Sequence, residues 1–452
     1  MCPRILLVNP PLYDFSAYDF WLKPYGMLRV AGFLRTCASL SLFDYMDRLS
    51  PLVPAPAPQP VSASARAANS KRRLPVARAR KFRADQWGRG EFYSEDAPRP
   101  ECLGRIRRRY HRFGIPRAAF RRFLRGDGPF DVALVQTGMT YQYLGVREVI
   151  EDLRAACPAT KIVLGGVYAT LCPQHARTLD ADLVVSGPNL DPLWRFLNVV
   201  PQTDGLPAWE LYPRLSSGVL KLTDGCPFSC TYCSVPKVYP GFSARPLERT
   251  LAEFDCLCRL GAQNIAFYDD ALLYQAERVL EPFLRAVLKR GAGVNFHTPN
   301  AINARFVTKD LARLMIEAGF KVIYLGFESS AAAWQQETGG KVSSDELARA
   351  VEHLVAAGAD PRHLHAYLML GHPRAELQNV EASMRYAGSL GIRLMLAEFS
   401  PIPGTPDGEL CRQWVDLDEP LNHSKTAFPI VLLGEAEVNR LKNLCGELNR
   451  EP

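Results

Sequence analysis

Residues 219–233 read VLKLTDGCPFSCTYC and decide the fold of the second half of the chain. The apolar start of this stretch predicts a buried strand over Val219–Thr223. Three cysteines follow within eight residues: Cys226, Cys230 and Cys233. Three thiolates at this spacing can bind three irons of a four-iron, four-sulfur (4Fe–4S) cluster and leave the fourth iron without a protein ligand. An open metal position of this kind is a place for a substrate or cofactor.

A zinc knot is the alternative use of the same cysteines. It needs a fourth ligand, and only Cys256 and Cys258 lie near enough in the sequence to supply one. The chain has 12 cysteines in 452 residues, too few for a disulfide scaffold, which favours metal binding or chemistry for those that cluster. We therefore expect the three cysteines to bind the iron–sulfur cluster.

Strand and helix patterns alternate from residue 205 to residue 405. Six strands are expected, at 219–223, 264–268, 294–297, 321–327, 365–370 and 393–399. Five helices are expected between them, at 247–260, 275–290, 308–318, 343–358 and 376–390. Six parallel strands in series predict a partial (β/α)6 barrel of the TIM type, whose chemistry lies on loops at the C-terminal ends of the strands. Residues 406–452 form a C-terminal tail of unknown role.

Residues 1–200 carry a second alternation of the α/β kind. Strands are expected at 4–8, 40–43, 132–136, 161–164 and 182–185, with helices at 24–35 and 145–156. This order predicts an N-terminal doubly wound parallel sheet of the Rossmann type. An insertion at about 51–127 interrupts it, in which a Pro/Ala-rich stretch is followed by a basic one.

The net charge of +7 conceals this basic segment. Residues 66–125 contain 17 Arg and 2 Lys against 5 acidic residues, so the rest of the chain is acidic overall. Aromatic residues alternate with arginines in Arg105–Phe113 and Phe120–Phe123, a composition that can stack on bases and hold phosphates. A nucleic acid is therefore a candidate partner. The alternative is a helix pair that packs its Phe and Tyr side chains inward.

The cysteine stretch resembles the CxxxCxxC signature of radical S-adenosylmethionine (SAM) enzymes. Four later segments at successive strand ends resemble SAM-site segments of that superfamily: Phe267–Asp270, Gly326–Ser329, Leu370–Pro373 and Ser400–Thr405. The resemblance implies a 4Fe–4S cluster on the three cysteines and S-adenosyl-L-methionine at its open iron. It also implies contacts with SAM from Tyr232, Asp269, Asp270, Glu328, Ser329 and Gly371.

The N-terminal plan resembles the cobalamin-binding domain of cobalamin-dependent radical SAM enzymes. The matching residues stand at expected strand ends: Asn9, Pro10, Thr140, Gly165 and Gly166. Glycines there let the backbone approach a large flat cofactor. No DxHxxG motif follows the first strand, so the resemblance implies cobalamin bound with its own base displaced and no histidine below cobalt. A nucleotide-type domain, or one that only packs on the barrel, is the alternative.

The resemblance implies an enzyme that cleaves SAM to a 5′-deoxyadenosyl radical and acts as a cobalamin-dependent methyltransferase on an unactivated carbon. Three alternatives stay open: a non-methylating radical SAM enzyme for rearrangement or ring formation, an RNA-modifying methylthiotransferase, and a non-enzymatic iron–sulfur scaffold. A methylthiotransferase normally needs a second cluster on three N-terminal cysteines, and those of this chain show no close spacing: Cys2, Cys37, Cys102, Cys157 and Cys172. The expected partners are an electron donor such as flavodoxin or ferredoxin and a small-molecule or peptide substrate that the sequence does not identify.

Catalytic residues are not identifiable from the sequence. Tyr141, Tyr143, His297 and His372 are candidates for a general acid or base. No apolar run reaches the roughly 18 residues needed to cross a bilayer. The N-terminus has only a four-residue apolar stretch before Asn9, too short for a secretory signal. We expect a metal-binding cytoplasmic enzyme.

Overall fold

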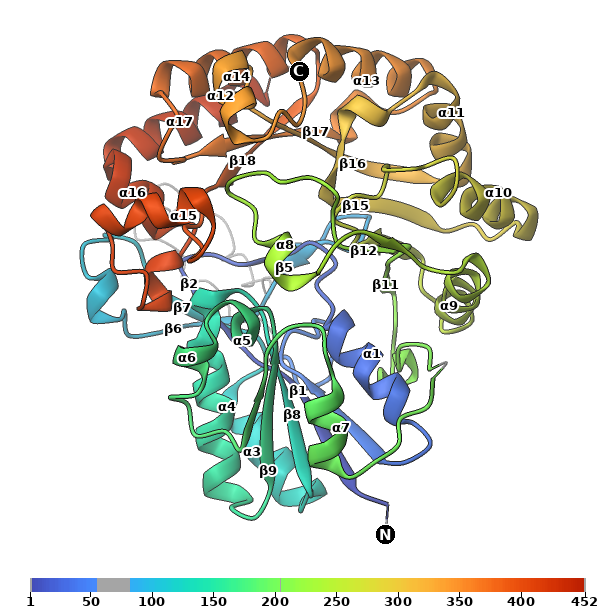
Figure 1. Ribbon diagram of the computed structural model, residues 1–452, viewed down its shortest axis with the longest axis vertical. Helices are drawn as coiled ribbons and strands as arrows, with labels where there is room; N and C mark the ends of the chain where they lie inside the picture. Colours follow the sequence, from blue (N-terminus) through green and yellow to red (C-terminus); the bar gives the residue numbers. More distant parts are fainter. Residues whose placement is uncertain (1, 55–81, 204, 451–452) are drawn as a thin grey trace, which may run out of the picture.

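The computed structural model describes residues 2–54, 82–203 and 205–450, and its two largest sheets are parallel (Figure 1). The N-terminal sheet consists, in spatial order, of β4 (Ser39–Asp44), β1 (Arg4–Asn9), β8 (Val132–Thr137), β9 (Lys161–Gly166) and β10 (Leu183–Val185). This is the 2-1-3-4-5 strand order of a doubly wound sheet, which confirms the predicted fold of this half. None of the helices in the described ranges has the length and apolar character needed to span a membrane.

Successive side chains of β1 point to opposite faces of the N-terminal sheet. The covering helices are α1 (Tyr25–Leu34), α3 (Arg117–Asp127), α4 (Tyr143–Ala156) and α7 (Asp191–Leu197). Leu6 and Val8 of β1 pack in one core with residues of α3 and α4. Ile5 and Leu7 pack in another core with residues of α1 and α7. Because both faces are buried, the strand is apolar throughout, as is typical of parallel sheets.

The second sheet is the open barrel expected from the sequence. Its strands, in spatial order, are β11 (Ser217–Leu220), β14 (Asn264–Phe267), β15 (Asn295–Asn303), β16 (Phe320–Glu328), β17 (Leu364–Leu370) and β18 (Arg393–Glu398). Its helices are α9 (Leu247–Arg259), α10 (Leu280–Arg290), α11 (Lys309–Ala318), α13 (Ser344–Ala356) and α14 (Leu377–Ser389). All neighbouring strands pair in parallel, and β11 and β18 form the two edges of the sheet. The partial (β/α)6 barrel is thereby confirmed.

The C-terminal tail completes the layer of helices around the barrel. It contains α15 (Pro406–Leu410), α16 (Ala427–Leu433) and α17 (Glu435–Leu448), which lie beside β18 in Figure 1. Val438, Leu441 and Cys445 of α17 are buried in the main core, and α17 packs against α14 and β18. These three residues lie on one face of the helix, so the tail is part of the barrel.

The described part of the insertion packs on the N-terminal domain. It supplies β6 (Ser94–Asp96) and β7 (His111–Phe113), which form an antiparallel sheet with β2 (Leu12–Asp14). Tyr110, Phe113 and Phe120 are buried, so these aromatic side chains pack inward. Arg112 is buried as well, with Nη2 2.7 Å from Oε1 of Glu148. The Pro/Ala-rich stretch and the start of the basic segment fall largely at 55–81, outside the described residues.

Two N-terminal segments enter the barrel where its strands begin. The Trp21 ring stacks on His297, with ring centroids 4.1 Å apart, and Trp21 Nε1–H donates to the carbonyl oxygen of Trp87 at 2.6 Å. Arg89 Nη1 donates to the hydroxyl of Tyr324 at 2.5 Å. We refer to these five residues as the barrel floor. They close the end of the barrel opposite to the loops expected to carry chemistry.

Candidate functional site

The loop that carries the three cysteines has a narrow base. It is closed by a short antiparallel pair, β12 (Thr223–Asp224) and β13 (Ser243–Ala244), and it includes α8 (Val235–Val238). Gly225 stands at this base with φ 76°. A side chain there would come 2.0 Å from the carbonyl oxygen of Gly241, so only glycine lets the two strands of the base approach.

The three cysteines are free and partly exposed. Burial raises the pKa of each thiol, that of Cys233 to about 11, an effect that a bound cation offsets. Within the described residues, no three His, Cys, Asp or Glu side chains converge closely enough to hold a single metal ion. A 4Fe–4S cluster binds its thiolates through separate irons and does not need that convergence. The cysteine loop therefore fits such a cluster with one open iron.

Glu328 ends β16 in a strained conformation. Its φ is 62°, in the left-handed region that residues with side chains rarely adopt. Oε1 lies 2.7 Å from Nζ of Lys341, whereas Oε2 is buried with no hydrogen-bond partner. Gln335 holds this backbone by donating from Nε2 to the carbonyl oxygens of Phe327 and Ser329. The strain and the unpartnered oxygen together indicate a ligand-binding group.

Lys341 is a site residue that the sequence analysis missed. It follows Gly339 and Gly340, and a side chain at Gly339 would come 3.1 Å from Cα of Cys230. The glycines thus let this loop approach the cysteine loop. Burial acts to lower the pKa of Lys341, but the Glu328 carboxylate beside it raises that pKa overall, so the ammonium stays charged. The sequence Gly339-Gly340-Lys341 was the signal that could have identified this lysine, because two adjacent glycines allow a close approach of the backbone.

Asp269 and Asp270 follow β14 and have different surroundings. Oδ1 of Asp269 accepts hydrogen bonds from the backbone N–H groups of Leu222 and Thr223 and from the Thr223 hydroxyl. Its Oδ2 has no partner, and burial raises the pKa of this carboxyl to about 6. Oδ2 of Asp270 lies 3.6 Å from Nζ of Lys221. Asp269 thus fixes the chain just before the cysteine loop, and each aspartate keeps one oxygen without a hydrogen bond.

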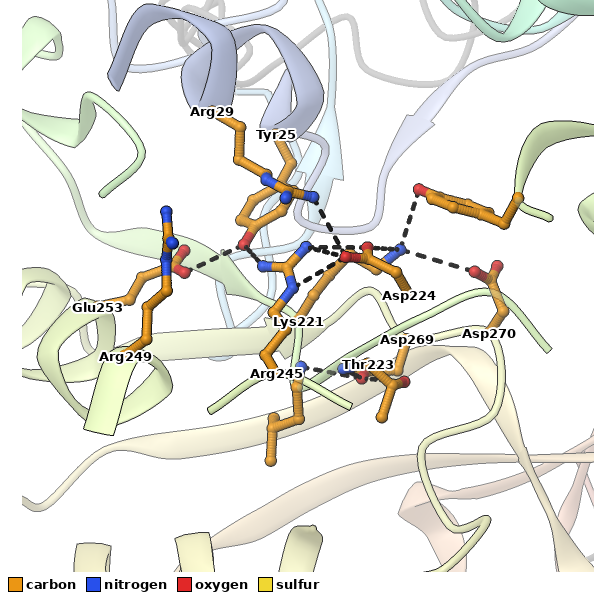
Figure 2. Close-up of polar contacts among 12 residues, drawn as sticks. Tyr25, Arg29, Lys221, Thr223, Asp224, Arg245, Arg249, Glu253, Asp269 and Asp270 are labelled. Atoms are coloured by element: carbon orange, nitrogen blue, oxygen red, sulfur yellow. Dashed lines mark hydrogen bonds and ion pairs between the residues drawn. The ribbon is translucent and has the colours of Figure 1, made fainter. Parts of the chain in front are cut away.

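An ion-pair network joins the same stretch to the N-terminal domain (Figure 2). Arg245 binds the carboxylate of Asp224 through Nη2 at 2.9 Å and Nε at 3.1 Å, and Arg29 of α1 binds it at 3.3 Å. Arg245 also donates to the hydroxyl of Tyr25, which in turn donates to Oε2 of Glu253 at 3.0 Å. Burial acts to raise the pKa of Asp224, but the cations hold it at about 2. The two domains are therefore joined through fixed charges beside the cysteine loop.

Tyr232 is partly buried and belongs to a set of rings that we call the aromatic group: Tyr232, Trp334, His372 and Phe399. Tyr232 lies parallel to Trp334 at 6.0 Å between centroids, and His372 meets Tyr232 edge-on at 5.9 Å. His372 also meets Phe399 edge-on at 5.0 Å. The aromatic residue of the cysteine motif is thus held by rings from the segments that follow later strands, and these rings form a flat wall beside the three cysteines.

Two other residues predicted to contact SAM have protein neighbours. The Ser329 hydroxyl accepts a hydrogen bond from the backbone N–H of Ala331 at 3.1 Å. Gly371 has φ 80°, and a side chain there would come 2.6 Å from Cβ of Pro429 in α16. The close approach of the tail accounts for glycine at this position.

Three of the residues predicted to bind cobalamin contact other parts of the chain. Asn9 Nδ2 donates to Oδ1 of Asp44 at 2.7 Å, and Pro10 is buried. Oγ1 of Thr140 lies 2.9 Å from Nδ1 of His423 in the tail. These residues shape the ends of the strands.

Gly165 and Gly166 end β9 at an open surface. A side-chain carbon at Gly165 would have no neighbour closer than 4.0 Å, in Val185. Gly166 has φ 115°, and a side chain there would come 2.4 Å from the carbonyl oxygen of Thr137. The next helix, α5 (Val167–Leu171), packs beside α8 of the cysteine loop. The open strand end is thus followed by a helix that contacts the cysteine loop, and it fits the approach of a large flat cofactor.

The four candidates for a general acid or base are all buried. Burial raises the pKa of Tyr141 and of Tyr143, whose hydroxyl donates to Glu419. His297 lies in the barrel floor, and burial lowers its pKa to about 3, so it is neutral. His372 belongs to the aromatic group. The structure therefore assigns no proton-transfer role to these residues.

Comparison with known proteins assigns the site to a superfamily. Residues 220–387 match the sequence model of the Radical SAM superfamily, and the three cysteines stand at the start of the matched region. Residues 220–387 are therefore a domain of the radical SAM superfamily. Such a domain implies a 4Fe–4S cluster and SAM, which the cysteine loop and the unpartnered oxygen of Glu328 fit.

Two curated relatives cover part of the chain. An uncharacterized methyltransferase of Pyrococcus horikoshii, PH0819, is 25% identical over 226 residues, which are 47% of this chain and 47% of that protein. The ribosomal protein uS12 methylthiotransferase RimO of Chlorobium phaeobacteroides is 31% identical over 176 residues, which are 37% of this chain and 40% of that protein. The chain thus spans less than half the length of each of these relatives.

A solved structure shares the arrangement of both domains. TsrM from Kitasatospora setae, a radical SAM methyltransferase solved with tryptophan and a SAM analogue bound, superposes with a TM-score of 0.62 at 14% identity. The match covers 91% of this chain and 76% of TsrM. The same protein with cobalamin and a [4Fe–4S] cluster bound gives a TM-score of 0.61. At this identity the likeness shows a common fold over nearly the whole chain.

Proposed function

We propose that this protein is a radical SAM enzyme whose N-terminal domain binds cobalamin for methyl transfer to an unactivated carbon. The observation that carries the proposal is the open surface at Gly165 near the end of β9, because β9 leads into α5, which contacts α8 of the cysteine loop. The similarity to a protein named as a methyltransferase, and to the fold of a methyltransferase solved with cobalamin, supports it.

The cofactors would supply the reactive chemistry, and the chain would bind and orient them. When bound, the cluster supplies the electron that cleaves SAM to the 5′-deoxyadenosyl radical, and cobalamin serves as the methyl carrier. The three cysteines would hold the cluster, and Oε2 of Glu328 is available to accept a hydrogen bond from a ribose hydroxyl. Tyr232 offers a flat wall for adenine. A reduced flavodoxin or ferredoxin would donate the electron, and the substrate would be a small molecule or a peptide.

The test replaces Gly165 by Val in protein made with cobalamin available. Valine fits a strand, and its Cβ would meet no atom closer than 4.0 Å, so the fold should persist while the cofactor surface is blocked. Gly293→Val is the matched control, because Gly293 also has an open surrounding but precedes β15 at the other end of the barrel. Gly166 is unsuitable, since its conformation requires glycine.

The readout needs no substrate. Wild-type protein and Gly293→Val should retain corrin through gel filtration and form both S-adenosylhomocysteine and 5′-deoxyadenosine from SAM. Gly165→Val should lose corrin and S-adenosylhomocysteine but keep 5′-deoxyadenosine. Folded wild-type protein that retains no corrin and forms 5′-deoxyadenosine alone would favour the non-methylating alternative. Tight SAM binding without cleavage under reduction would favour the iron–sulfur scaffold.

A methylthiotransferase is the second candidate, because a named methylthiotransferase is 31% identical to part of this chain. That activity normally needs a second cluster. The five cysteines that precede the cysteine loop, Cys2, Cys37, Cys102, Cys157 and Cys172, have no close spacing in the sequence that would suit one. Eight irons per chain after anaerobic reconstitution, instead of four, would favour this candidate, and binding to RNA would then be expected through the basic insertion.

A further inference from the structure

A carboxylate of the C-terminal tail binds the cysteine loop. Asp407 lies in α15 and is 0% exposed. Its backbone N–H donates to the carbonyl oxygen of Thr231 at 3.2 Å, and the Thr231 hydroxyl donates to Oδ2 of Asp407. Thr231 stands between Cys230 and Tyr232. One tail residue therefore holds both the backbone and the side chain of the cysteine motif.

The same carboxylate binds the loop that follows β17. His372 donates from Nε2 to Oδ2 of Asp407 at 3.0 Å, and Arg374 donates from Nε to Oδ1 at 2.7 Å. Nδ1 of His372 accepts from the indole N–H of Trp334 and from the backbone N–H of Arg374, both at 3.2 Å. The second nitrogen, Nε2, is thus the one that carries the proton. Burial acts to raise the pKa of Asp407, but these hydrogen bonds hold it at about 2.

We propose that Asp407 is a positioning residue for SAM, which fixes the cysteine loop against the aromatic group so that Tyr232 and the cluster ligands present one preformed site. The proposal rests on the proposed function, since the site is that of SAM. Hydrogen bonds to a charged acceptor are roughly twice as strong as neutral ones, and a preformed site binds its ligand without the cost of ordering a loop. Asp407 acts through Thr231 and His372.

The test compares Asp407→Asn, Thr231→Val and the double variant in anaerobically reconstituted full-length protein. Asp418→Asn is the matched control, because this carboxylate lies in the same tail with its side chain 82% exposed. Iron and sulfide content should equal wild type in all variants. SAM affinity should fall about tenfold or more in each of the first two. The double variant should lose less SAM affinity than the sum of the two single losses, because both changes remove the same hydrogen bond between Thr231 and Asp407.

A second readout separates positioning from stability. Adding saturating SAM should shift the electron paramagnetic resonance signal of the reduced cluster in wild type and in Asp418→Asn, and should shift it less in Asp407→Asn. Unchanged affinity and an unchanged shift in the variants would overturn the proposal, and so would loss of the cluster itself. If Asp407→Asn does not fold, Thr231→Val decides alone. A wild-type protein that reconstitutes no cluster or binds no SAM would overturn the proposed function instead.

Discussion

Replacing Glu328 by Gln is the most direct test of the SAM site. The substitution keeps the shape of the side chain and removes the charge of the carboxylate whose Oε2 has no partner. A hydrogen bond to a charged group contributes about 1.5–3 kcal/mol and a neutral one about 0.5–1.5 kcal/mol, so the loss is about 1–1.5 kcal/mol. This corresponds to a fall in SAM affinity of roughly tenfold. Glu328→Ala removes the whole interaction, and we expect a roughly ten- to hundredfold fall.

The neighbouring lysine has to be controlled in this experiment. Without the carboxylate, the partly buried ammonium of Lys341 loses its ion-pair partner, which costs stability apart from any effect on SAM. The double variant Glu328→Gln, Lys341→Met should recover thermal stability but not affinity.

SAM affinity would be measured by equilibrium dialysis of reconstituted protein with its iron content matched to wild type. Glu337→Gln, an exposed acid on α12 (Ala332–Thr338), should bind SAM like wild type. Glu328→Gln protein that binds SAM as tightly as wild type would refute the assignment of Glu328 to the site.

Two further outcomes are expected. The triple variant Cys226→Ala, Cys230→Ala, Cys233→Ala should hold no 4Fe–4S cluster after reconstitution, by absorbance and iron analysis, and zinc without a brown chromophore in wild type would contradict the cluster. Burial raises the pKa of Glu253 from 4.5 to about 7, so its contribution to stability is full below about pH 4.5 and is lost as the pH rises through about 7. Urea midpoints of wild type should therefore fall between about pH 5 and about pH 8, and the fall should be smaller in Glu253→Gln; an equal fall in both would contradict the role of this group.

The barrel was predictable because its signals are local. Each strand is a short apolar run, and Gly319 ends α11 in the left-handed conformation, with φ 105°, which glycine adopts readily at the end of a helix. The cysteine motif is recognisable for the same reason, since its spacing alone predicts a cluster. Tail helices such as α17 also have apolar residues at helical spacing, but they do not alternate with strands, so the sequence does not indicate where they pack.

The missed site residues depend on contacts between distant parts of the chain. Thr231 and Asp407 are 176 residues apart, and nothing in the sequence of the tail indicates which carboxylate binds the cysteine loop. The buried Arg112 is a residue for which the sequence suggests a wrong environment. Its place in a basic segment suggests a solvent-facing charge, but its partner Glu148 lies on α4, a helix that follows the segment. Composition cannot supply such pairings.

The barrel floor has a mechanical consequence. The loop that carries Trp21 leads directly into α1 of the N-terminal domain. The Trp21 ring stacks on His297 of the barrel and donates a hydrogen bond to Trp87 of the insertion. A hinge motion that separates the two domains would unstack this ring and break the ion pair between Arg29 and Asp224. The molecule should therefore behave as one rigid frame during turnover.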